Sequence, residues 1–525
     1  MNAQITLYDT TMRDGTQGEH INLSAEDKFR IAKKLDEFGI LYVEGGWPGS
    51  NPKDVRFFDM AREFNFKNSR ITAFSSTCRP GISPRDDENI RALLNTEMDT
   101  VTLFGKSWDL HATEILGISL KENLRMIRET VAYMRGEGRE VIYDAEHFFD
   151  GLRANPSYAM ETLQAAEEAG ANTIVLCDTN GGSMPREIAE MVAKAADRLK
   201  VPIGIHAHND CGLALANSLA AVEAGARMVQ GTINGYGERC GNVDLISIIG
   251  NLQLKMGYFC VPEERLKQLT ELSRYVSEVA NVPPMNQRPF VGQSAFAHKG
   301  GVHVSAIQKN PAAYEHMDPK QVGNRRRVLV SDLSGKSNIA YKAREMEIKL
   351  GGNGYDSQKI VNEIKRLEDE GYQFDAAEGS LELLIKKVTG QFHEPFALES
   401  FRVTTEKNRL GPSACQATIK ISVGNEEEIT AAEGDGPVNA LDNALRKALT
   451  KFFPQIDEMG LVDFKVRVID GSWGTGSKVR VQIESRDSRE IWSTIGVSEN
   501  IIEASWQALA DSFQYKLSKE TGAVL

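Results

Sequence analysis

His206 and His208, in the stretch PIGIHAHND, are the clearest candidates for metal ligands in this chain. Residues two apart on a strand share a face, so both imidazoles can bind one ion. The alternative is a pair of hydrogen-bonded core histidines. Two imidazoles do not complete a metal site, and a carboxylate is needed.

Asp14 can supply that carboxylate. It follows the first apolar run of the chain, ITLYD, whereas the histidines lie in the seventh. In a closed barrel of eight strands, the first and seventh strands are separated by only one neighbour. Two imidazoles, one carboxylate and open positions suit a catalytic divalent ion that also holds substrate oxygens. These residue types leave Mg²⁺, Mn²⁺ and Zn²⁺ open.

Arg13 and Glu146 each allow a catalytic and a structural interpretation. At a strand end beside a metal ligand, Arg13 can donate to a carbonyl oxygen whose negative charge grows as carbon attacks it, although a surface ion pair is commoner for arginine. Glu146 is either a base in a partly closed site or a salt-bridged structural acid. The glycine-rich segment GYGERCGN, residues 235–242, suits an anionic group but lacks the GxGxxG spacing of a dinucleotide turn.

The elements that must position these residues are eight short apolar runs that alternate with segments of helical period. The runs begin at Ile5, Leu41, Ile71, Thr100, Glu140, Asn172, Pro202 and Met228. In the first helical segment, Ser24 can cap the first turn and Gly39 can end the last. Eight strands alternating with helices over roughly 250 residues predict a (β/α)₈ TIM barrel, with an open doubly wound sheet as the alternative. The polar residues at the strand ends favour the barrel, because only there do they converge on one face.

We predict three domains. Residues 1–280 form the catalytic barrel. Residues 281–391 begin with the Pro-rich stretch NVPPMNQRPF and form a linker with helical subdomains. Residues 392–525 contain alternating strands such as ATIKISV and VDFKVRVID, and form an α+β regulatory domain. The helical segments GDGPVNALDNALRKAL and GVSENIIEASWQALADSF each follow strands, which indicates an internal duplication of one strand-rich unit closed by one helix.

Composition restricts the class of partner. The net charge of −12 over 525 residues argues against nucleic acid, and the short cluster Arg325 to Arg327 is expected to be a solvated turn. No apolar stretch is long enough to span a bilayer and no signal-peptide pattern opens the chain, so we expect a cytoplasmic protein without a membrane partner. Six scattered cysteines form no CxxC pair and are interpreted as reduced packing residues.

Taken together, the motifs resemble the acyl-CoA condensing family of isopropylmalate, citramalate and homocitrate synthases. Residues 8–15 resemble that family's (L/Y)DTTxRDG strand end. VEGG, Glu146, CDTNG, HAHND and GYGERCGN follow in the family's order, and the resemblance extends over essentially the whole chain. Several independent motifs in one order are very specific.

The resemblance implies a set of site residues. Mn²⁺ or Mg²⁺, with Zn²⁺ as an alternative, would be bound by Asp14, His206, His208 and Asn242. Arg13 would polarise the bound ketone. The substrate-binding residues would be Arg13, Glu44, Asp144 and Thr179.

The resemblance also implies a homodimer with shared active sites. In HKGGVHVSAI and AAYEHM, His303 and Tyr314 match residues that reach a partner subunit's barrel. Glu146 with His303 would remove a methyl proton from acetyl-CoA, and the resemblance does not settle which of the two accepts it. Hydrolysis of the thioester would follow.

Substrate and effector are implied in the same way. The turn EGGWPGSNPKD looks like the citramalate branch, which implies pyruvate as the 2-oxo acid and isoleucine as the inhibiting end product. Trp47 either narrows the pocket for a methyl ketone or packs in the core, and reaction with 2-oxobutyrate is expected because one methylene is worth only roughly 1–3 kcal/mol. The alternatives are a synthase acting on 2-oxoisovalerate, a metal-dependent lyase or aldolase, and a non-catalytic amino-acid sensor.

Overall fold

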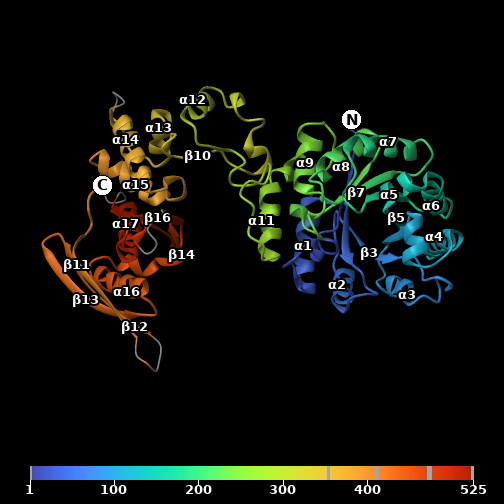
Figure 1. Cartoon of the computed structure of the whole chain (residues 1–525), viewed down its shortest axis with the longest axis horizontal. Helices are drawn as coiled ribbons and strands as arrows, with labels where there is room; N and C mark the ends of the chain where they lie inside the picture. The colour runs from blue at the N-terminus through green and yellow to red at the C-terminus, as the bar shows by residue number, and fades with distance from the viewer. Residues whose placement is uncertain (1–2, 352–354, 408, 410–412, 470–475, 522–525) are drawn as a thin grey trace. The chain divides into compact units, whose positions relative to one another are not determined.

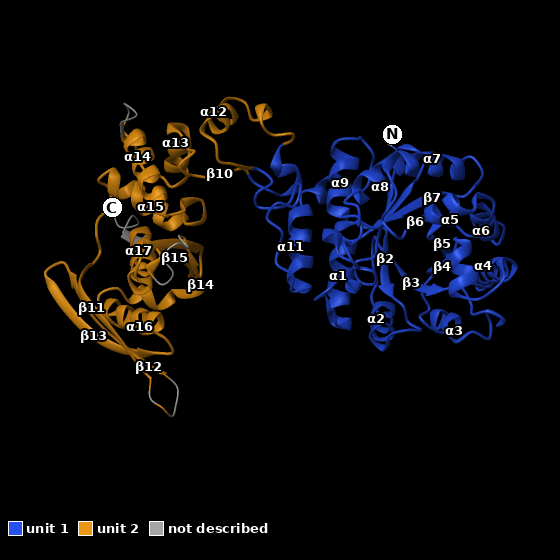
Figure 2. Ribbon diagram, viewed as in Figure 1, with its two compact units in different colours: residues 1–296, 318–325 blue, residues 297–317, 326–525 orange. Residues whose placement is uncertain are grey.

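A computed structural model describes residues 3–351, 355–407, 409, 413–469 and 476–521. The chain divides into two compact units (Figure 2), of which the first comprises residues 1–296 and 318–325 and the second residues 297–317 and 326–525. Each unit has its own core and is described by itself.

The first unit is a closed barrel of eight parallel strands in sequence order, which confirms the predicted TIM barrel. Closure is made by β1, which pairs with β2 on one side and with β8 on the other, so an open doubly wound sheet is excluded. The strands are β1 (Thr6–Asp9), β2 (Tyr42–Gly46), β3 (Arg70–Ser76), β4 (Thr100–Lys106), β5 (Glu140–Glu146), β6 (Thr173–Asp178), β7 (Ile203–Ala207) and β8 (Met228–Gly231).

Helices surround these strands (Figure 1). Ser24 accepts a hydrogen bond from Asp27 N at the start of α1, and Gly39 ends that helix with φ of 97°, both as predicted. The helices are α1 (Ala25–Phe38), α2 (Pro52–Arg62), α3 (Glu88–Asn95), α4 (Leu120–Gly136), α5 (Phe148–Ala154), α6 (Pro156–Glu168), α7 (Pro185–Ala196), α8 (Ala214–Glu223), α9 (Leu245–Leu254), α10 (Glu263–Leu266) and α11 (Leu269–Val279).

Side chains fill the interior of the barrel. Tyr8 and Tyr42 stack with ring centroids 6.1 Å apart and pack with Ile142, Val175 and Met228. The barrel is therefore a packed core and not a pore, and ligands must bind where the strands end.

The second unit begins with helices joined by a short two-stranded sheet. That sheet pairs β9 (Ala297–His298) with β10 (Arg327–Val328). The expectation of a solvated turn at Arg325 to Arg327 is wrong, because Arg327 is in β10 and Arg326 pairs with the buried Glu315, which also binds His298. The helices are α12 (Gly301–Lys309), α13 (Lys336–Glu345), α14 (Tyr355–Asp369) and α15 (Glu378–Val388).

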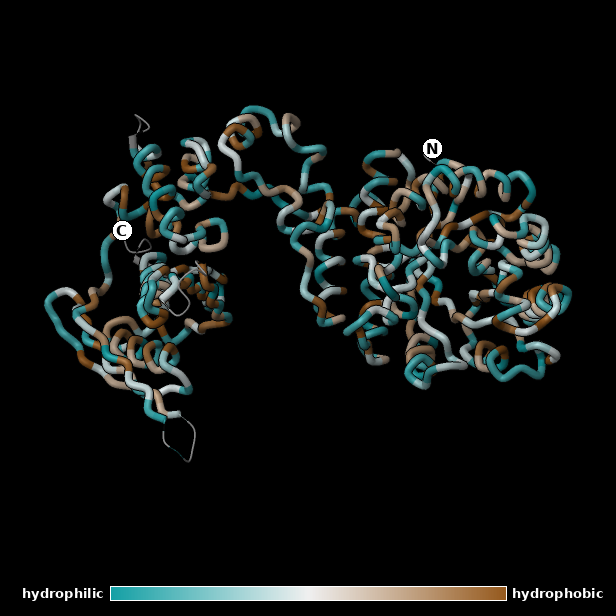
Figure 3. Tube along the Cα trace, viewed as in Figure 1, coloured by the Kyte–Doolittle hydropathy of each residue, from teal (hydrophilic) through white to brown (hydrophobic). Residues whose placement is uncertain are grey.

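The rest of the second unit consists of two three-stranded antiparallel sheets, each followed by one helix, which confirms the predicted duplication. The same hydrogen bond occurs within each repeat. Thr430 Oγ1 donates to Ala444 O in the first and Thr494 Oγ1 donates to Ala508 O in the second, each at 2.7 Å and across 14 residues. Hydrophobic residues recur among hydrophilic ones along the helices (Figure 3), and in α16 the buried ones lie at helical spacing. The elements are β11 (Ala397–Lys407), β12 (Ser413–Val423), β13 (Glu426–Gly434), α16 (Pro437–Thr450), β14 (Gly460–Val468), β15 (Val479–Arg486), β16 (Ile491–Ser498) and α17 (Ile501–Thr521).

The cysteines are free, and four of the six are buried. Cys211 and Cys240 are exposed, so the interpretation of all six as packing residues is wrong for these two, which lie in loops. In the described part of the chain, no helix has the length and apolarity that a membrane crossing requires.

Candidate active site

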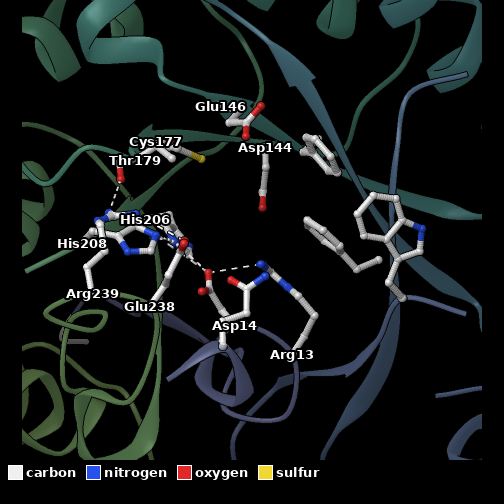
Figure 4. A pocket seen from close by; sticks show the side chains of 14 residues that line it. Arg13, Asp14, Asp144, Glu146, Cys177, Thr179, His206, His208, Glu238 and Arg239 are labelled. Atoms are coloured by element: carbon white, nitrogen blue, oxygen red, sulfur yellow. Dashed lines mark hydrogen bonds and ion pairs between the residues drawn. The ribbon is translucent and has the colours of Figure 1, made fainter. Parts of the chain in front are cut away.

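The predicted site residues of the barrel gather around one cavity of about 270 Å³ where the strands end (Figure 4). The residues that line it are Arg13, Asp14, Gln17, Trp47, Phe74, Phe104, Asp144, Glu146, Cys177, Thr179, His206, His208, Glu238 and Arg239. Glu44 and Asn242 are not in this lining but contact residues of it. The predicted convergence on one face of the barrel is therefore observed.

Asp14, His206 and His208 form a buried cluster whose ligand atoms all lie within 4.8 Å of one another. His206 Nε2 lies 3.4 Å from Asp14 Oδ2, His208 Nε2 lies 3.9 Å from the same oxygen, and the two nitrogens are 3.3 Å apart. Three atoms at these separations share a point about 2.1 Å from each, which matches the ligand distances of Zn²⁺ and Mg²⁺. The donor set fits a divalent ion.

Gln230 in β8 fixes the orientation of His206. Its Nε2 donates to Asp144 Oδ1 at 2.8 Å, so its Oε1 is left to accept from His206 Nδ1 at 2.9 Å. His206 Nε2 is then the nitrogen that faces Asp14 and His208. Sequence reasoning missed Gln230, because a single glutamine in a strand belongs to no metal motif.

Burial and neighbouring charges together set the protonation of the cluster. Burial lowers the pKa of His208 to about 4, so the ring is neutral near pH 7 and can act as a ligand. Burial alone would raise the pKa of Asp14, but Arg13 and His206 outweigh it and hold that pKa well below its usual range. A permanently ionised carboxylate beside a neutral imidazole favours a cation.

Asn242 lies next to His208, with which it forms an isolated β-bridge. Its Nδ2 donates to Tyr236 O at 3.3 Å, while its buried Oδ1 has no hydrogen-bond partner. His208 Nδ1 and Asp14 Oδ1 are likewise buried without one. Buried polar atoms without partners on three residues of one cluster are unusual in a folded protein and fit a site that takes up a further group.

Arg13 is held from three sides. Its Nη1 lies 3.1 Å from Asp14 Oδ2 and its Nε lies 3.2 Å from Glu44 Oε2. Its guanidinium carbon lies 3.9 Å above the centre of the Phe74 ring. Glu44 is fully buried and accepts a hydrogen bond from Thr10 Oγ1, so its carboxylate is fixed where it contacts the Arg13 side chain.

Glu146 and Asp144 are two residues apart in β5 and both line the cavity. Lys106, at the end of β4, pairs with Glu146. Burial raises the pKa of Asp144 to about 7. Lys106 is a second residue that sequence reasoning missed, and the polar strand end TVTLFGK was its only signal.

Thr179 and Arg239 also line this cavity. Thr179 Oγ1 accepts from His147 N at 2.9 Å, and Arg239 Nη2 donates to Thr179 O at 2.7 Å. Arg239 also binds Asp210, with Nε 2.7 Å from Oδ1. The loop that carries Arg239 is therefore tied to the end of β6.

Trp47 forms an aromatic wall with Phe74 and Phe104. Its ring lies edge-on to both, with centroids 5.9 and 5.6 Å away. Trp47 N donates to Asp54 Oδ2 at 2.8 Å, which fixes the turn after β2. A Cβ on Gly46, whose φ is 143°, would lie 2.3 Å from Asp54, so the turn requires glycine there.

His303 and Tyr314 belong to the second unit. Their rings stack with centroids 4.2 Å apart and an interplanar angle of 28°. Tyr314 is 46% exposed and His303 is exposed. The two residues form a pair on the surface of their own unit.

The fold and the site define a TIM barrel whose cavity holds a buried Asp/His/His cluster that could bind a metal ion. The family model described as HMGL-like matches residues 4–276 and the model of the homocitrate synthase post-HMGL domain matches residues 290–372. The LeuA allosteric (dimerisation) domain matches residues 375–517. The chain belongs to the HMGL-like family of acyl-CoA-dependent enzymes, as the motifs had predicted.

Curated relatives narrow this class. A protein of Aquifex aeolicus curated as (R)-citramalate synthase is 53% identical over 99% of this chain and 99% of its own length. Another with the same name, from Geobacter sulfurreducens, is 54% identical over 98% of each chain. A probable 2-isopropylmalate synthase of Methanopyrus kandleri is 33% identical over 96% of this chain and 97% of its own.

Proposed function

We propose that this enzyme condenses acetyl-CoA with pyruvate and, with water, gives (R)-citramalate and CoA. The observation that supports this most strongly is the similarity over nearly the full chain to proteins curated as (R)-citramalate synthase. The site supports the same reaction, because one cavity combines a cluster of candidate metal ligands, an arginine (Arg13) and a further carboxylate (Glu146).

We propose Asp14, His206, His208 and Asn242 as the residues that hold a divalent ion, Mn²⁺ or Mg²⁺, with Zn²⁺ as an alternative. Such an ion would supply Lewis-acid polarisation of the oxygens of a 2-oxo acid. His208→Ala is expected to abolish CoA release, because it removes one of two imidazoles, while circular dichroism and the unfolding midpoint stay close to those of the parent. Full activity in this variant would remove the metal argument.

Arg13 is proposed to serve the carbon–carbon bond-forming step. Its guanidinium is fixed by Asp14 and Glu44 and borders the cavity, so it can donate to the keto oxygen as negative charge grows there. Thr179 is proposed to contact the carboxylate of the 2-oxo acid, and Asp144 to contact the same substrate. Glu44 was predicted to bind the substrate, but it is fully buried and does not line the cavity, so we propose that it acts by holding Arg13.

Glu146 is proposed to accept the proton that leaves the methyl group of acetyl-CoA. The structural alternative has support as well, since Glu146 pairs with Lys106. The two interpretations are compatible, because Lys106 can hold the carboxylate in place until the thioester enters.

His303 and Tyr314 of the partner subunit are proposed to complete the site in a homodimer. The exposure of the stacked pair supports this, as does the exposed apolar face of β14 formed by Val462, Phe464 and Val466. Mixing the inactive variants Glu146→Ala and His303→Ala should restore CoA release, because a mixed dimer contains one intact site. No recovery in a mixture shown to exchange subunits would contradict shared sites.

Substrate choice is tested by CoA release with Mn²⁺ or Mg²⁺, comparing pyruvate, 2-oxobutyrate, 2-oxoisovalerate and 2-oxoglutarate. Pyruvate is expected to be preferred, with lower activity on 2-oxobutyrate. Preference for 2-oxoisovalerate would move the enzyme to the 2-isopropylmalate branch. No release with any acid would favour a lyase or an amino-acid sensor, although the sensor has less support because all three ligands of the cluster are present.

Isoleucine is proposed as the inhibiting end product, bound by the two repeats of the allosteric domain. Support comes from the start of α16, where Gly436 offers no side-chain cap, so backbone N–H groups are available to a carboxylate. At α17, Asn500 Oδ1 already accepts from Ile502 N at 2.9 Å. Inhibition of CoA release by isoleucine, compared with leucine and valine, tests the effector's identity.

A further inference from the structure

A buried ion pair lies behind the turn that carries Trp47. Lys28, in α1, is 2% exposed, and Asp54, in the first turn of α2, is 5% exposed. Their side chains form a salt bridge, and neither residue lines the barrel cavity. The pair is therefore a charged contact between two helices that the proposed chemistry does not use.

Both side chains also hold the backbone that leads from β2 to α2. Lys28 Nζ donates to Gly45 O at 3.1 Å, near the end of β2. Asp54 binds Lys28 through Oδ1, and its Oδ2 accepts from Trp47 N at 2.8 Å. The two helices and the turn between β2 and α2 are thus joined at one place.

The backbone of Trp47 is fixed at both of its polar groups. Its N–H donates to Asp54, and its carbonyl oxygen accepts from Ser50 N at 3.1 Å and from Asn51 N at 3.2 Å. Trp47 lines the barrel cavity, whereas Lys28 and Asp54 do not. Any effect of the ion pair on a bound substrate must therefore pass through Trp47.

Close packing transmits the position of α2 to the turn. A Cβ on Gly45 would collide with the ring of Phe57, which is buried in α2. The turn is therefore pressed against α2 as well as hydrogen-bonded to it. A shift of Asp54 or of its helix moves the residues from Gly45 to Trp47.

A buried ion pair is not the most stabilising contact that two helices can make. Removing two charges from water costs free energy that their attraction only partly offsets, and apolar residues of similar volume often stabilise a fold as well or better. Burial lowers the pKa of Lys28, although Asp54 acts in the opposite direction. What the pair supplies, and apolar residues could not, is one directed hydrogen bond from each side chain to the turn.

We propose that the Lys28–Asp54 pair positions Trp47 and thereby limits the length of the 2-oxo acid that the cavity accepts. The pair holds the turn, and the turn holds the backbone of Trp47. The ring of Trp47 then lies edge-on to Phe74 and Phe104 in the aromatic wall. This inference rests on the proposed condensation, because chain length matters only to an enzyme that binds such an acid.

The test compares CoA release from pyruvate and from 2-oxobutyrate in the full-length parent and in Lys28→Met. The ratio of kcat/KM for 2-oxobutyrate to that for pyruvate should rise by up to roughly tenfold, the change expected when the Trp47 ring is removed altogether. Lys28→Met leaves the Asp54 carboxylate buried without its cation. The double variant Lys28→Met with Asp54→Asn is therefore measured beside it, because it removes both charges.

Asp36→Asn is the matched control. Asp36 is a buried carboxylate of the same helix, and its Oδ1 accepts from Asn68 N and Ser69 N, each at 2.7 Å, outside the cavity lining. Its loss should lower the unfolding midpoint but leave the substrate ratio unchanged. In a Trp47→Ala background, Lys28→Met should also leave the ratio unchanged, because the ring through which the pair acts is gone.

An unchanged ratio in the folded variants, at any level of activity, would overturn the proposal, as would a change that persists without the Trp47 ring. If the parent released CoA with no 2-oxo acid, the condensation itself would fail. The pair is then tested by hydrogen exchange of residues 45–51. Faster exchange in Lys28→Met than in Asp36→Asn would keep the pair as the support of Trp47, and equal exchange would overturn that role too.

Discussion

The substitution Gln230→Met tests how the barrel prepares His206 for a metal ion. Methionine has a similar volume but cannot accept the hydrogen bond from His206 Nδ1, which is 2.9 Å long in the parent. A buried N–H left without an acceptor costs about 1–3 kcal/mol. Loss of a partner that orients a ligand histidine typically weakens metal binding about 10- to 100-fold, which agrees with that cost. We therefore expect the Kd for Mn²⁺ to rise by about this factor.

The assay is titration of the metal-free protein with Mn²⁺, followed by electron paramagnetic resonance of the free ion, together with CoA release at increasing Mn²⁺. Gln253→Met is the matched control, because Gln253 in α9 is also a hydrogen-bonded glutamine but donates to Val261 O at 2.8 Å and does not line the barrel cavity. Gln253→Met should leave the Kd for Mn²⁺ unchanged, even if its unfolding midpoint falls. Saturating Mn²⁺ should restore part of the activity of Gln230→Met.

Two results would refute this reasoning. An unchanged Kd for Mn²⁺ in Gln230→Met would mean that Gln230 does not set the orientation of His206. If activity were lost at saturating Mn²⁺ while the Kd for Mn²⁺ stayed normal, Gln230 would act through its other partner, Asp144. Gln230 Nε2 donates to Asp144 Oδ1 at 2.8 Å.

Three further predictions follow from the site and the domains. Trp47→Ala removes one ring of the aromatic wall. The ratio of kcat/KM for 2-oxobutyrate to that for pyruvate should rise roughly tenfold, because one methylene is worth about 1–3 kcal/mol. An unchanged ratio would mean that Trp47 serves only packing. In the metal-free protein, burial raises the pKa of Asp144 to about 7, so between about pH 4 and 7 the folded state holds a proton that the unfolded state releases. The free energy of unfolding therefore falls as the pH rises from about 4 to 7, by roughly 1.4 kcal/mol per unit of pKa shift. Asp144→Asn should flatten this fall in urea unfolding at pH 5 and 8 with EDTA, and an equal slope in the two proteins would contradict the assignment. Deleting the residues after Gln391 should leave some CoA release but no response to isoleucine, and a truncated enzyme that isoleucine still inhibits would contradict this division of labour.

The sequence predicted the barrel and the centre of the site because both follow from local patterns. Eight apolar runs with helical segments between them need no long-range information, and each run became a strand of the closed sheet. Asp14 and His206 could be paired because closure places their strands one neighbour apart. Gln230 and Lys106 could not be found in this way, since each is a single polar residue whose role depends on its partner in the neighbouring strand.

Helix α15 shows why the domain boundaries stay a prediction. Leu381 and Ile385 pack in the core of α13 and α14, whereas Leu383 packs in the core of the two repeats. A helix with apolar residues on two faces is buried on both, and its sequence does not say to which neighbour it belongs. The predicted boundary at residue 391 puts α15 with the helical subdomains, while the allosteric-domain model includes it from residue 375. Ser380 on this helix also donates to Asp511 of α17 at 2.7 Å, so α15 is joined to the second repeat by a hydrogen bond as well as packed on α13 and α14.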